Sequence, residues 1–359
     1  MPFLSLSLAN FRNLNNGTLD ISAKEVFFVG ENGQGKSNLL ESLYFASYAS
    51  SFRTHTDSEI ATYGLKDFSV RTQFKDMNEK TSFIGIYLKD GKKKIERNGK
   101  TVKDRKELVN TIPCVLFCHS DMEFASGEPE RRRFFIDQSL TMHDSLYIDT
   151  LRCYKKVLKS RNIVLKEQKT QVLEALDLQL VENGLEIQTK RQELIRFFDL
   201  YFSDLYKEIS GIENVHVVYA PSWKAETSVE ILEILSQKKD IDIQMGTTMS
   251  GPHRDNIRFV KDGKPFVPGA STGQRRLLSI LLRIMQAKYY MGQTHKKPVL
   301  LMDDVLLELD PEKRRKVTAL LPEYDQLFCT FLPGEPYDRY KKSTTKIYGI
   351  DGGKWELKN

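Results

Sequence analysis

Residues 30–37 read Gly-Glu-Asn-Gly-Gln-Gly-Lys-Ser, a glycine-rich pattern that ends in Lys36 and Ser37. The apolar run 26–29 precedes it, and apolar residues recur at helical spacing along 38–48 after it. These flanks predict a buried strand before the glycines and a helix after them. In this order the backbone N–H groups of the loop and the helix N-terminus surround phosphate oxygens. The stretch therefore predicts a P-loop that binds the phosphates of a nucleotide in an α/β fold, while the class of NTPase depends on the distal half of the chain.

Each residue of this loop has an expected role. Lys36 is expected to reach the β and γ phosphates and to act as a catalytic residue. Ser37 is expected to supply a hydroxyl to Mg²⁺, which keeps several waters and needs only a few hard oxygen ligands. The residues expected to contact the nucleotide are Gly30, Glu31, Asn32, Gly33, Gln34, Gly35, Lys36 and Ser37.

A pair of carboxylates follows a strand-like run near residue 300. Val299-Leu-Leu-Met302 is apolar, and Asp303 and Asp304 come directly after it. This is the form of a Walker B strand. In that interpretation Asp303 holds Mg²⁺ directly or through water, and Asp304 is the catalytic residue that orients or deprotonates the attacking water. The alternative is two acidic residues that only cap a strand.

Two short segments resemble motifs of ABC-type ATPases. Ser271-Thr-Gly-Gln274 resembles the ABC signature, although Thr272 replaces the usual first glycine, and Glu308-Leu-Asp310 resembles the D-loop. In that superfamily the signature of one subunit closes on the γ-phosphate bound to another, so ATP becomes part of a dimer interface. The residues that this resemblance places on the nucleotide are Ser271, Gly273, Gln274 and Asp310. A helix capped by Ser271 or Thr272 is the alternative for the first segment.

The remaining patterns predict strand-rich and helical stretches. Turn signals predict hairpins over 81–102 and 257–267, and helical spacing predicts helices within 129–221 and over 274–291. The heptad pattern does not persist, so a long coiled coil is not expected. The predicted fold class is α/β, an ABC-type P-loop ATPase head that is SMC-like without a long coiled coil, with a helical second lobe. The predicted domains are 1–125 plus 246–359 for the ATPase and 126–245 for a mainly helical insertion.

Composition limits the class of protein. The 359 residues carry a formal net charge of +6, and the pI near 8.9 favours polyanionic partners without identifying one. No long apolar run and no signal-like N-terminus occur, so a cytoplasmic protein with no membrane partner is expected. The four cysteines are expected to be reduced. Cys114 and Cys118, beside His119, lie in an apolar run and are interpreted as buried strand thiols rather than zinc ligands.

Over nearly its whole length the sequence resembles the RecF proteins. The segments that carry the resemblance are 10–13 (Asn-Phe-Arg-Asn), 30–37, 51–54 (Ser-Phe-Arg-Thr), 131–137 (Arg-Arg-Arg-Phe-Phe-Ile-Asp), Tyr154 with Arg161-Asn162, and 250–255 (Ser-Gly-Pro-His-Arg-Asp). The chain departs from the family at 118–121 and at 330–332, and no switch histidine follows Asp304. The resemblance implies an ATP-dependent homodimer with slow turnover that binds gapped or junction DNA. With RecO and RecR it would help to load RecA onto single strands.

The densest basic segments are the candidate DNA-binding surface. Contacts from such side chains to phosphates give binding that is independent of base sequence and sensitive to salt. The candidates are Arg131, Arg132, Arg133, Lys155, Lys156 and Lys159. Solvated helix faces are the alternative for the lysines, and service to the ATPase lobe or to a partner protein is the alternative for the arginines.

Three other functions share some of these motifs. A transporter ATPase subunit would need a surface for a membrane partner, and it usually carries a conventional signature. An ATPase of a defence or nuclease system would need an acidic nuclease cluster, which does not follow Asp310. A purely ATP-gated scaffold would bind DNA and partners without useful turnover.

Overall fold

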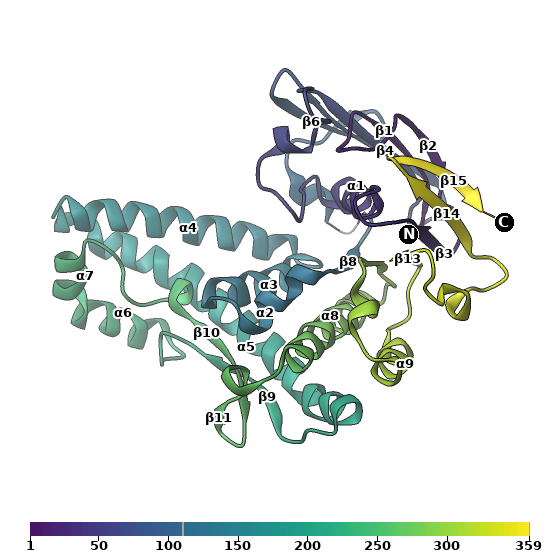
Figure 1. Ribbon diagram of the computed structural model, residues 1–359. Coiled ribbons are helices and arrows are strands. Elements are labelled where there is room, and N and C mark those ends of the chain that lie inside the picture. The colour runs from purple at the N-terminus through teal and green to yellow at the C-terminus, as the bar shows by residue number, and fades with distance from the viewer. Residues whose placement is uncertain (110, 359) are drawn as a thin grey trace. The chain divides into compact units, whose positions relative to one another are not determined.

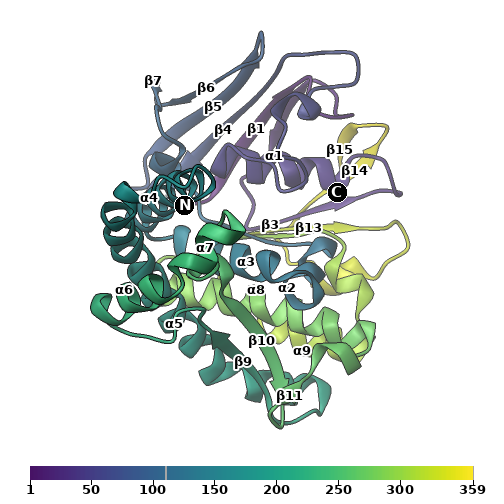
Figure 2. The same ribbon diagram turned by 90° about the vertical axis from the view of Figure 1, so that its left-hand side faces the viewer.

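The computed structural model describes residues 1–109 and 111–358, apart from the side chains of Leu307 and Glu308. The chain divides into two units, and each is described by itself. Figure 1 labels their elements and Figure 2 shows them from a second side. Unit 1 comprises Met1–Ser120 and Gln286–Asn359, and unit 2 comprises Asp121–Met285.

A mostly parallel sheet carries the glycine loop in unit 1. In spatial order its strands are β15 (Lys354–Lys358), β14 (Lys346–Asp351), β3 (Glu25–Val29), β13 (Gln326–Phe331), β12 (Val299–Met302) and β8 (Cys114–Phe117). β3 lies between β13 and β14 and is parallel to both. Every residue of β3, β8, β12 and β13 is buried, as is typical of parallel strands that are covered on both faces. The predicted strands at 26–29 and 299–302 are confirmed.

The second sheet of unit 1 is antiparallel. In spatial order its strands are β2 (Gly17–Asp20), β1 (Phe3–Ala9), β4 (Phe68–Lys75), β5 (Thr81–Lys89), β6 (Lys92–Arg97) and β7 (Lys100–Thr101). The turns Asp90-Gly91 and Asn98-Gly99 have positive φ at both residues, which is the hairpin geometry that Asp-Gly and Asn-Gly favour. The predicted hairpins over 81–102 are confirmed.

Helix α1 (Lys36–Tyr48) packs between these two sheets. It contacts β4 and β5 on one side and β8, β12 and β13 on the other, and Figure 2 shows it between the two layers. Leu39, Leu40 and Leu43 are fully buried in the core that results. Because α1 is fixed on both sides, the loop that enters it is held at the end of β3. Later in unit 1, α9 (Pro311–Leu320) follows the acidic pair.

Unit 2 is mainly helical. Its first helices are α2 (Met122–Ser126), α3 (Pro129–Thr141), α4 (Ser145–Lys166) and α5 (Leu173–Ser210), and α6 (Ser228–Gln237) and α7 (Lys239–Met245) come later. α5 packs against α3, α4 and α6. A Cβ at Gly184 of α5 would lie 2.5 Å from the ring of the buried Trp223. This glycine therefore lets the indole pack against the helix backbone.

The helical prediction for 129–221 is wrong for its last part. α5 ends at Gly211, whose φ of 72° is left-handed, and Val215–Ala220 forms the strand β9. β9 pairs antiparallel with β10 (Asn256–Lys261), and β10 pairs with β11 (Lys264–Pro265). The valine-rich segment after Gly211 favours a strand once a partner is available, and β10 lies far along the sequence. The predicted hairpin at 257–267 is confirmed.

Helix α8 (Thr272–Thr294) confirms the predicted helix at 274–291 and crosses the boundary between the units. Residues 246–285 were expected with the ATPase domain, but they belong to unit 2, because β10 pairs with β9. The first boundary falls after Ser120 rather than after residue 125. Which residues act together as the ATPase domain stays a prediction.

Two expectations from composition concern burial. Cys114 and Cys118 are buried, and burial raises the pKa of the Cys114 thiol to about 12. The interpretation of these residues as buried thiols is confirmed, with Cys114 in β8 and Cys118 directly after it. Within residues 1–109 and 111–358, no helix has the length and apolar character needed to cross a membrane.

Candidate functional site

The glycine loop is shaped by residues that have no side chain. Gly33 and Gly35 have φ values of 78° and 115°, which L-residues with side chains rarely adopt. A Cβ at Gly30 would lie 2.3 Å from the Ile350 carbonyl oxygen of the neighbouring strand. The loop therefore turns sharply from β3 into α1. Its tip, Glu31 to Gly33, is exposed.

Lys36 and Ser37 begin α1. The Lys36 ammonium is buried against the loop and donates to the carbonyl oxygens of Gly30 and Glu31 at 2.7 and 3.1 Å. Ser37 Oγ donates to Asp303 Oδ1 at 2.8 Å. The structure thus brings together two residues 266 positions apart that were both expected to serve a metal ion.

The two carboxylates after β12 share one hydroxyl. Thr330 Oγ1 lies 2.7 Å from Asp304 Oδ1 and 3.2 Å from Asp303 Oδ1, and it accepts the backbone N–H of Asp304 at 2.8 Å. Asp304 has a φ of 54°, so its backbone departs from the strand in the left-handed region. Thr330 was noted in the sequence only as a departure from the family. No local signal connects it with Asp303 and Asp304, because it lies on a different strand.

Burial raises the pKa of Asp303, and the negative charge of Asp304 raises it further. The hydrogen bonds from Ser37 and Thr330 oppose this shift, as does the positive charge of Arg53. A buried carboxylate with a raised pKa gains stability from a cation beside it. Ser37 and Asp303 therefore form a hard-oxygen pair that suits Mg²⁺.

The turn between β14 and β15 supports the loop from outside. Gln34 accepts Gly352 N–H with its side chain at 2.7 Å and Gly353 N–H with its backbone oxygen at 2.9 Å. A Cβ at Gly353 would lie 1.9 Å from the backbone oxygen of Asn13, whose side chain donates to Gly33 O at 3.1 Å. Sequence reasoning missed this support, because the paired glycines indicate a turn but not what the turn touches.

Replacing Gly353 with alanine is expected to weaken this support. The residue has a φ of 79°, and the added methyl meets Asn13 O, so the variant should lose about 1–3 kcal/mol of unfolding free energy and bind ATP more weakly. Urea unfolding and nucleotide titration measure both effects. Gly352→Ala is the control, because it has a φ of 52° with no atom within 4 Å of its Cβ. Equal losses in the two variants would contradict a role for the collision.

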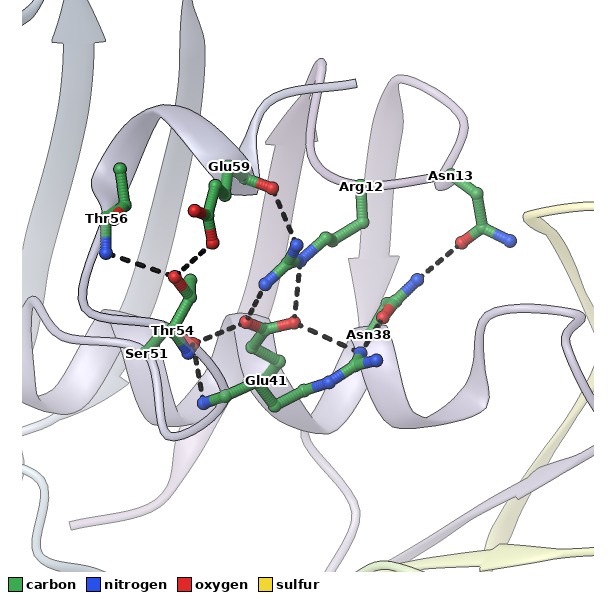
Figure 3. A network of polar contacts seen from close by, with 9 residues as sticks. Arg12, Asn13, Asn38, Glu41, Ser51, Thr54, Thr56 and Glu59 are labelled. Carbon is green, nitrogen blue, oxygen red and sulfur yellow. Dashed lines mark hydrogen bonds and ion pairs between the residues drawn. The ribbon is translucent and has the colours of Figure 1, made fainter. Parts of the chain in front are cut away.

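The buried carboxylate of Glu41 on α1 contacts side chains from two further segments of the chain (Figure 3). Glu41 is fully buried and accepts both Nε and Nη2 of Arg12 at 3.0 and 2.7 Å. Ser51 Oγ donates to it at 2.5 Å, and Arg53 lies 3.5 Å away. Arg53 also donates to Asn38 Oδ1 at 2.5 Å. The RecF-like segments 10–13 and 51–54 therefore act on the helix that follows the glycine loop.

Comparison with known proteins shows which family this chain belongs to. The family model described as RecF/RecN/SMC N terminal domain matches residues 3–352. A Treponema pallidum (strain Nichols) protein named DNA replication and repair protein RecF is 48% identical over 348 residues, covering 97% of this chain and 99% of the relative. The chain belongs to the RecF family. RecF proteins are DNA replication and repair proteins, and the resemblance seen in the sequence is confirmed.

Solved structures show the same fold. The recombination mediator protein RecF with ATP, of the RecFOR pathway, matches with a TM-score of 0.88 and 27% identity, covering 99% of this chain and 97% of that one. The Smc head bound to the C-winged helix domain of ScpA matches with a TM-score of 0.59 and 16% identity, covering 99% and 96%. The predicted SMC-like ATPase head is confirmed as the fold of this RecF-family chain.

The signature-like segment has the geometry of a helix cap in this RecF-family chain. Ser271 Oγ accepts the N–H of Gln274 at 3.3 Å, and Gln274 Oε1 accepts the N–H of Ser271 at 2.7 Å. This reciprocal pair is a capping box at the start of α8. Ser271 and Gly273 are exposed, so the cap leaves them accessible. A nucleotide contact in a second subunit stays a prediction for Ser271, Gly273 and Gln274.

Asp310 also caps a helix. Its carboxylate accepts Lys313 N–H at 2.9 Å at the start of α9 and Lys313 Nζ at 2.7 Å, and these bonds to Lys313 lower its pKa. The side chain of Glu308, the first residue of the D-loop-like segment, lies outside the described residues. The D-loop role of Asp310 stays a prediction.

The candidate DNA-binding arginines differ in exposure. Arg131 is exposed and pairs with Glu123 at 3.0 Å. Arg132 and Arg133 are partly buried and donate to the backbone oxygens of Gly127 and Asp255 at 2.5 and 2.7 Å. The candidate lysines Lys155, Lys156 and Lys159 lie on α4 and are exposed. Their role in binding DNA stays a prediction.

Proposed function

We propose that this RecF-family protein is an ATP-dependent DNA-binding protein of recombinational gap repair. The observation that carries the proposal is the cluster at the end of β3 and β12, where Ser37, Asp303 and Asp304 meet beside the glycine loop. The likeness to a RecF structure with ATP supports the nucleotide.

The chemistry proposed for the site follows from its side chains. Mg²⁺ bound to ATP supplies positive charge that stabilises the phosphates, and Ser37 and Asp303 are the residues that would hold it. Lys36 exchanges its bonds to the loop carbonyls for phosphate oxygens. Asp304 accepts the proton of the water that attacks the γ-phosphorus, so that ADP leaves and inorganic phosphate forms. We infer slow turnover, since no histidine follows Asp304 and its described partner is the hydroxyl of Thr330.

The exposed caps support dimerisation on ATP. Ser271, Gly273 and Gln274 of one copy, with Asp310, would complete the γ-phosphate site of a second copy. Shifting such an equilibrium from about 1:99 to about 99:1 takes roughly 5.5 kcal/mol of differential binding. Charge-assisted hydrogen bonds to two γ-phosphates supply energies of this order.

Gapped or junction DNA is the proposed substrate. The basic residues of α3 and α4, with the net charge of +6, favour binding to phosphates. RecR and RecO are the proposed partners in loading RecA, because the RecF–ATP structure is of the RecFOR pathway. The proposed location is the cytoplasm.

The experiment that tests the proposal measures binding of a gapped duplex at two salt concentrations with ATP, ADP or no nucleotide. Light scattering follows the mass. We expect binding to be at least about tenfold tighter and the mass to double only with ATP, with affinity falling as salt rises. Lys36→Arg should lose the ATP effect, because the longer guanidinium does not fit the buried position of the ammonium.

Lys24→Arg is the matched control. Lys24 is exposed and precedes β3, so the same exchange of side chains there should leave DNA binding unchanged. If the unaltered protein binds the gapped duplex equally well with ATP, with ADP and without nucleotide, the proposal is contradicted. Such a result would favour an ATPase with a protein or membrane partner instead.

A further inference from the structure

A cavity of about 410 Å³ in unit 2 is lined by three arginines. They are Arg132 on α3, Arg258 on β10 and Arg275 on the first turn of α8. The remaining wall includes Phe259 and Pro265. All the lining residues belong to unit 2, so the cavity is defined within one unit.

The guanidinium groups of this cavity have unused donors. Arg132 donates to Gly127 O at 2.5 Å and to Asn256 Oδ1 at 3.2 Å, while its buried Nε has no partner. The Nε of Arg275 is also buried without a partner. Within the described residues, the side chain of Arg258 makes no hydrogen bond and no ion pair. The two Nε atoms have almost no accessible surface, whereas the side chain of Arg258 is exposed, so the donors that a ligand in the cavity can reach directly are those of Arg258.

The charges of the cavity are unbalanced. Glu128 is the one carboxylate among the lining residues, against three guanidinium groups, which leaves two positive charges in excess (3 − 1 = 2). Burial lowers the pKa of Arg132, and the charges of Arg133 and Arg258 lower it further, while Glu128 raises it. Like charges held together in a partly buried space favour an anion between them.

We propose that the cavity lined by Arg132, Arg258 and Arg275 binds a phosphate group. Guanidinium forks match the oxygens of phosphate in pairs, and an excess of two positive charges suits a phosphate better than a single carboxylate. A phosphodiester of DNA and a phosphate of a nucleotide share this chemistry. The DNA source rests on the function proposed above, whereas the phosphate site itself does not.

The first measurement uses inorganic phosphate alone. The variants are Arg258→Gln, Arg275→Gln and the double variant, and Lys261→Gln removes the same charge from β10 outside the cavity. We expect phosphate to raise the melting temperature of the unaltered protein and of Lys261→Gln more than that of the double variant. Titration with phosphate should show a binding event in the unaltered protein that the double variant lacks. The affinity of that binding event should be at least about tenfold weaker in each single variant. Binding at the glycine loop is common to all these proteins and cancels in the comparison.

Two outcomes of this measurement would overturn the proposal. One is an equal effect of phosphate on the double variant and the unaltered protein. The other is an equal shift from succinate at the same ionic strength, which would show a general anion site rather than a phosphate site. Circular dichroism and the melting temperature without phosphate report whether each variant is folded, and the single variants decide the result if the double variant is not.

The second measurement identifies the source of the phosphate. For a phosphodiester, each lost arginine should reduce the slope of log affinity against log salt by about 0.9 on duplex DNA, with no change in Lys261→Gln. For a nucleotide, the salt slope should stay and the ATP-dependent doubling of mass should weaken. A protein that binds no DNA would contradict the function proposed above and leave the inorganic phosphate result standing.

Discussion

Asp304→Asn is expected to bind ATP and to double its mass with ATP while hydrolysing it about 10²–10⁴ times more slowly. The amide has the shape of the carboxylate but cannot take the proton of the attacking water. Its oxygen can still accept the Thr330 hydroxyl, which lies 2.7 Å from Asp304 Oδ1. Asparagine also tolerates the φ of 54° at this position, so the backbone should be preserved.

Single-turnover phosphate release, together with nucleotide titration and light scattering, measures these effects separately. Asp90→Asn is the matched control, because Asp90 is exposed, lies in unit 1 and has a φ of 49°. That exchange makes the same change in charge at a similar backbone conformation in a hairpin turn. Hydrolysis by Asp304→Asn at the unaltered rate would show that another group activates the water.

Arg191→Met is expected to reduce the free energy of unfolding by about 3–5 kcal/mol. Arg191 of α5 is 4% exposed. It donates to both oxygens of Asp137 on α3 at 2.9 and 2.8 Å, to Asp255 Oδ2 at 2.9 Å and to Pro252 O at 2.6 Å. Methionine fills most of the volume but leaves Asp137 and Asp255 without their cation.

Urea unfolding measures this loss, and Lys190→Met is the control. Lys190 pairs with Asp144 at 2.5 Å near the surface, so its loss should cost about 0–1 kcal/mol. Burial already raises the pKa of Asp255, with Arg191 opposing that shift, so removing Arg191 should raise it further. Because the pKa of the Asp255 carboxyl is raised in the folded state, this carboxyl lowers the stability of the folded state as the pH rises from the ordinary carboxyl pKa through the raised one. Lowering the pH should therefore recover part of the loss. Equal losses at positions 190 and 191 would contradict the role of this network.

The sequence allowed the elements around the glycine loop to be predicted because their signals are local. The glycines of 30–37 predict the conformation of this loop without reference to distant residues. The Asp-Gly and Asn-Gly pairs predict their turns in the same way. β9 was missed, because a short valine-rich segment becomes a strand only beside β10. Thr330 was missed for a similar reason, since its meaning comes from the strand next to it rather than from its neighbours in sequence.

The segment from Arg131 to Arg133 shows a second reason why the sequence alone did not predict the contacts of each residue. Three consecutive arginines indicate positive charge but not where each side chain goes. In the structure Arg132 and Arg133 donate to backbone oxygens, and only Arg131 is exposed. Consecutive residues of a helix point to different faces. The sequence therefore predicted a positively charged segment, but not which of its arginines are exposed and which bind the backbone.

The strand that leads into the glycine loop has a consequence for the growing chain. β3 lies between β13 and β14, and the turn at Gly352-Gly353 holds Gln34. These partners are synthesised long after β3, since the ribosome needs roughly 15–60 seconds to pass from residue 38 to residue 353 at about 5–20 residues per second. A nascent chain therefore exposes the glycine loop without its supporting strands and turn until Gly353 has been synthesised, so the loop reaches its folded surroundings only after that point.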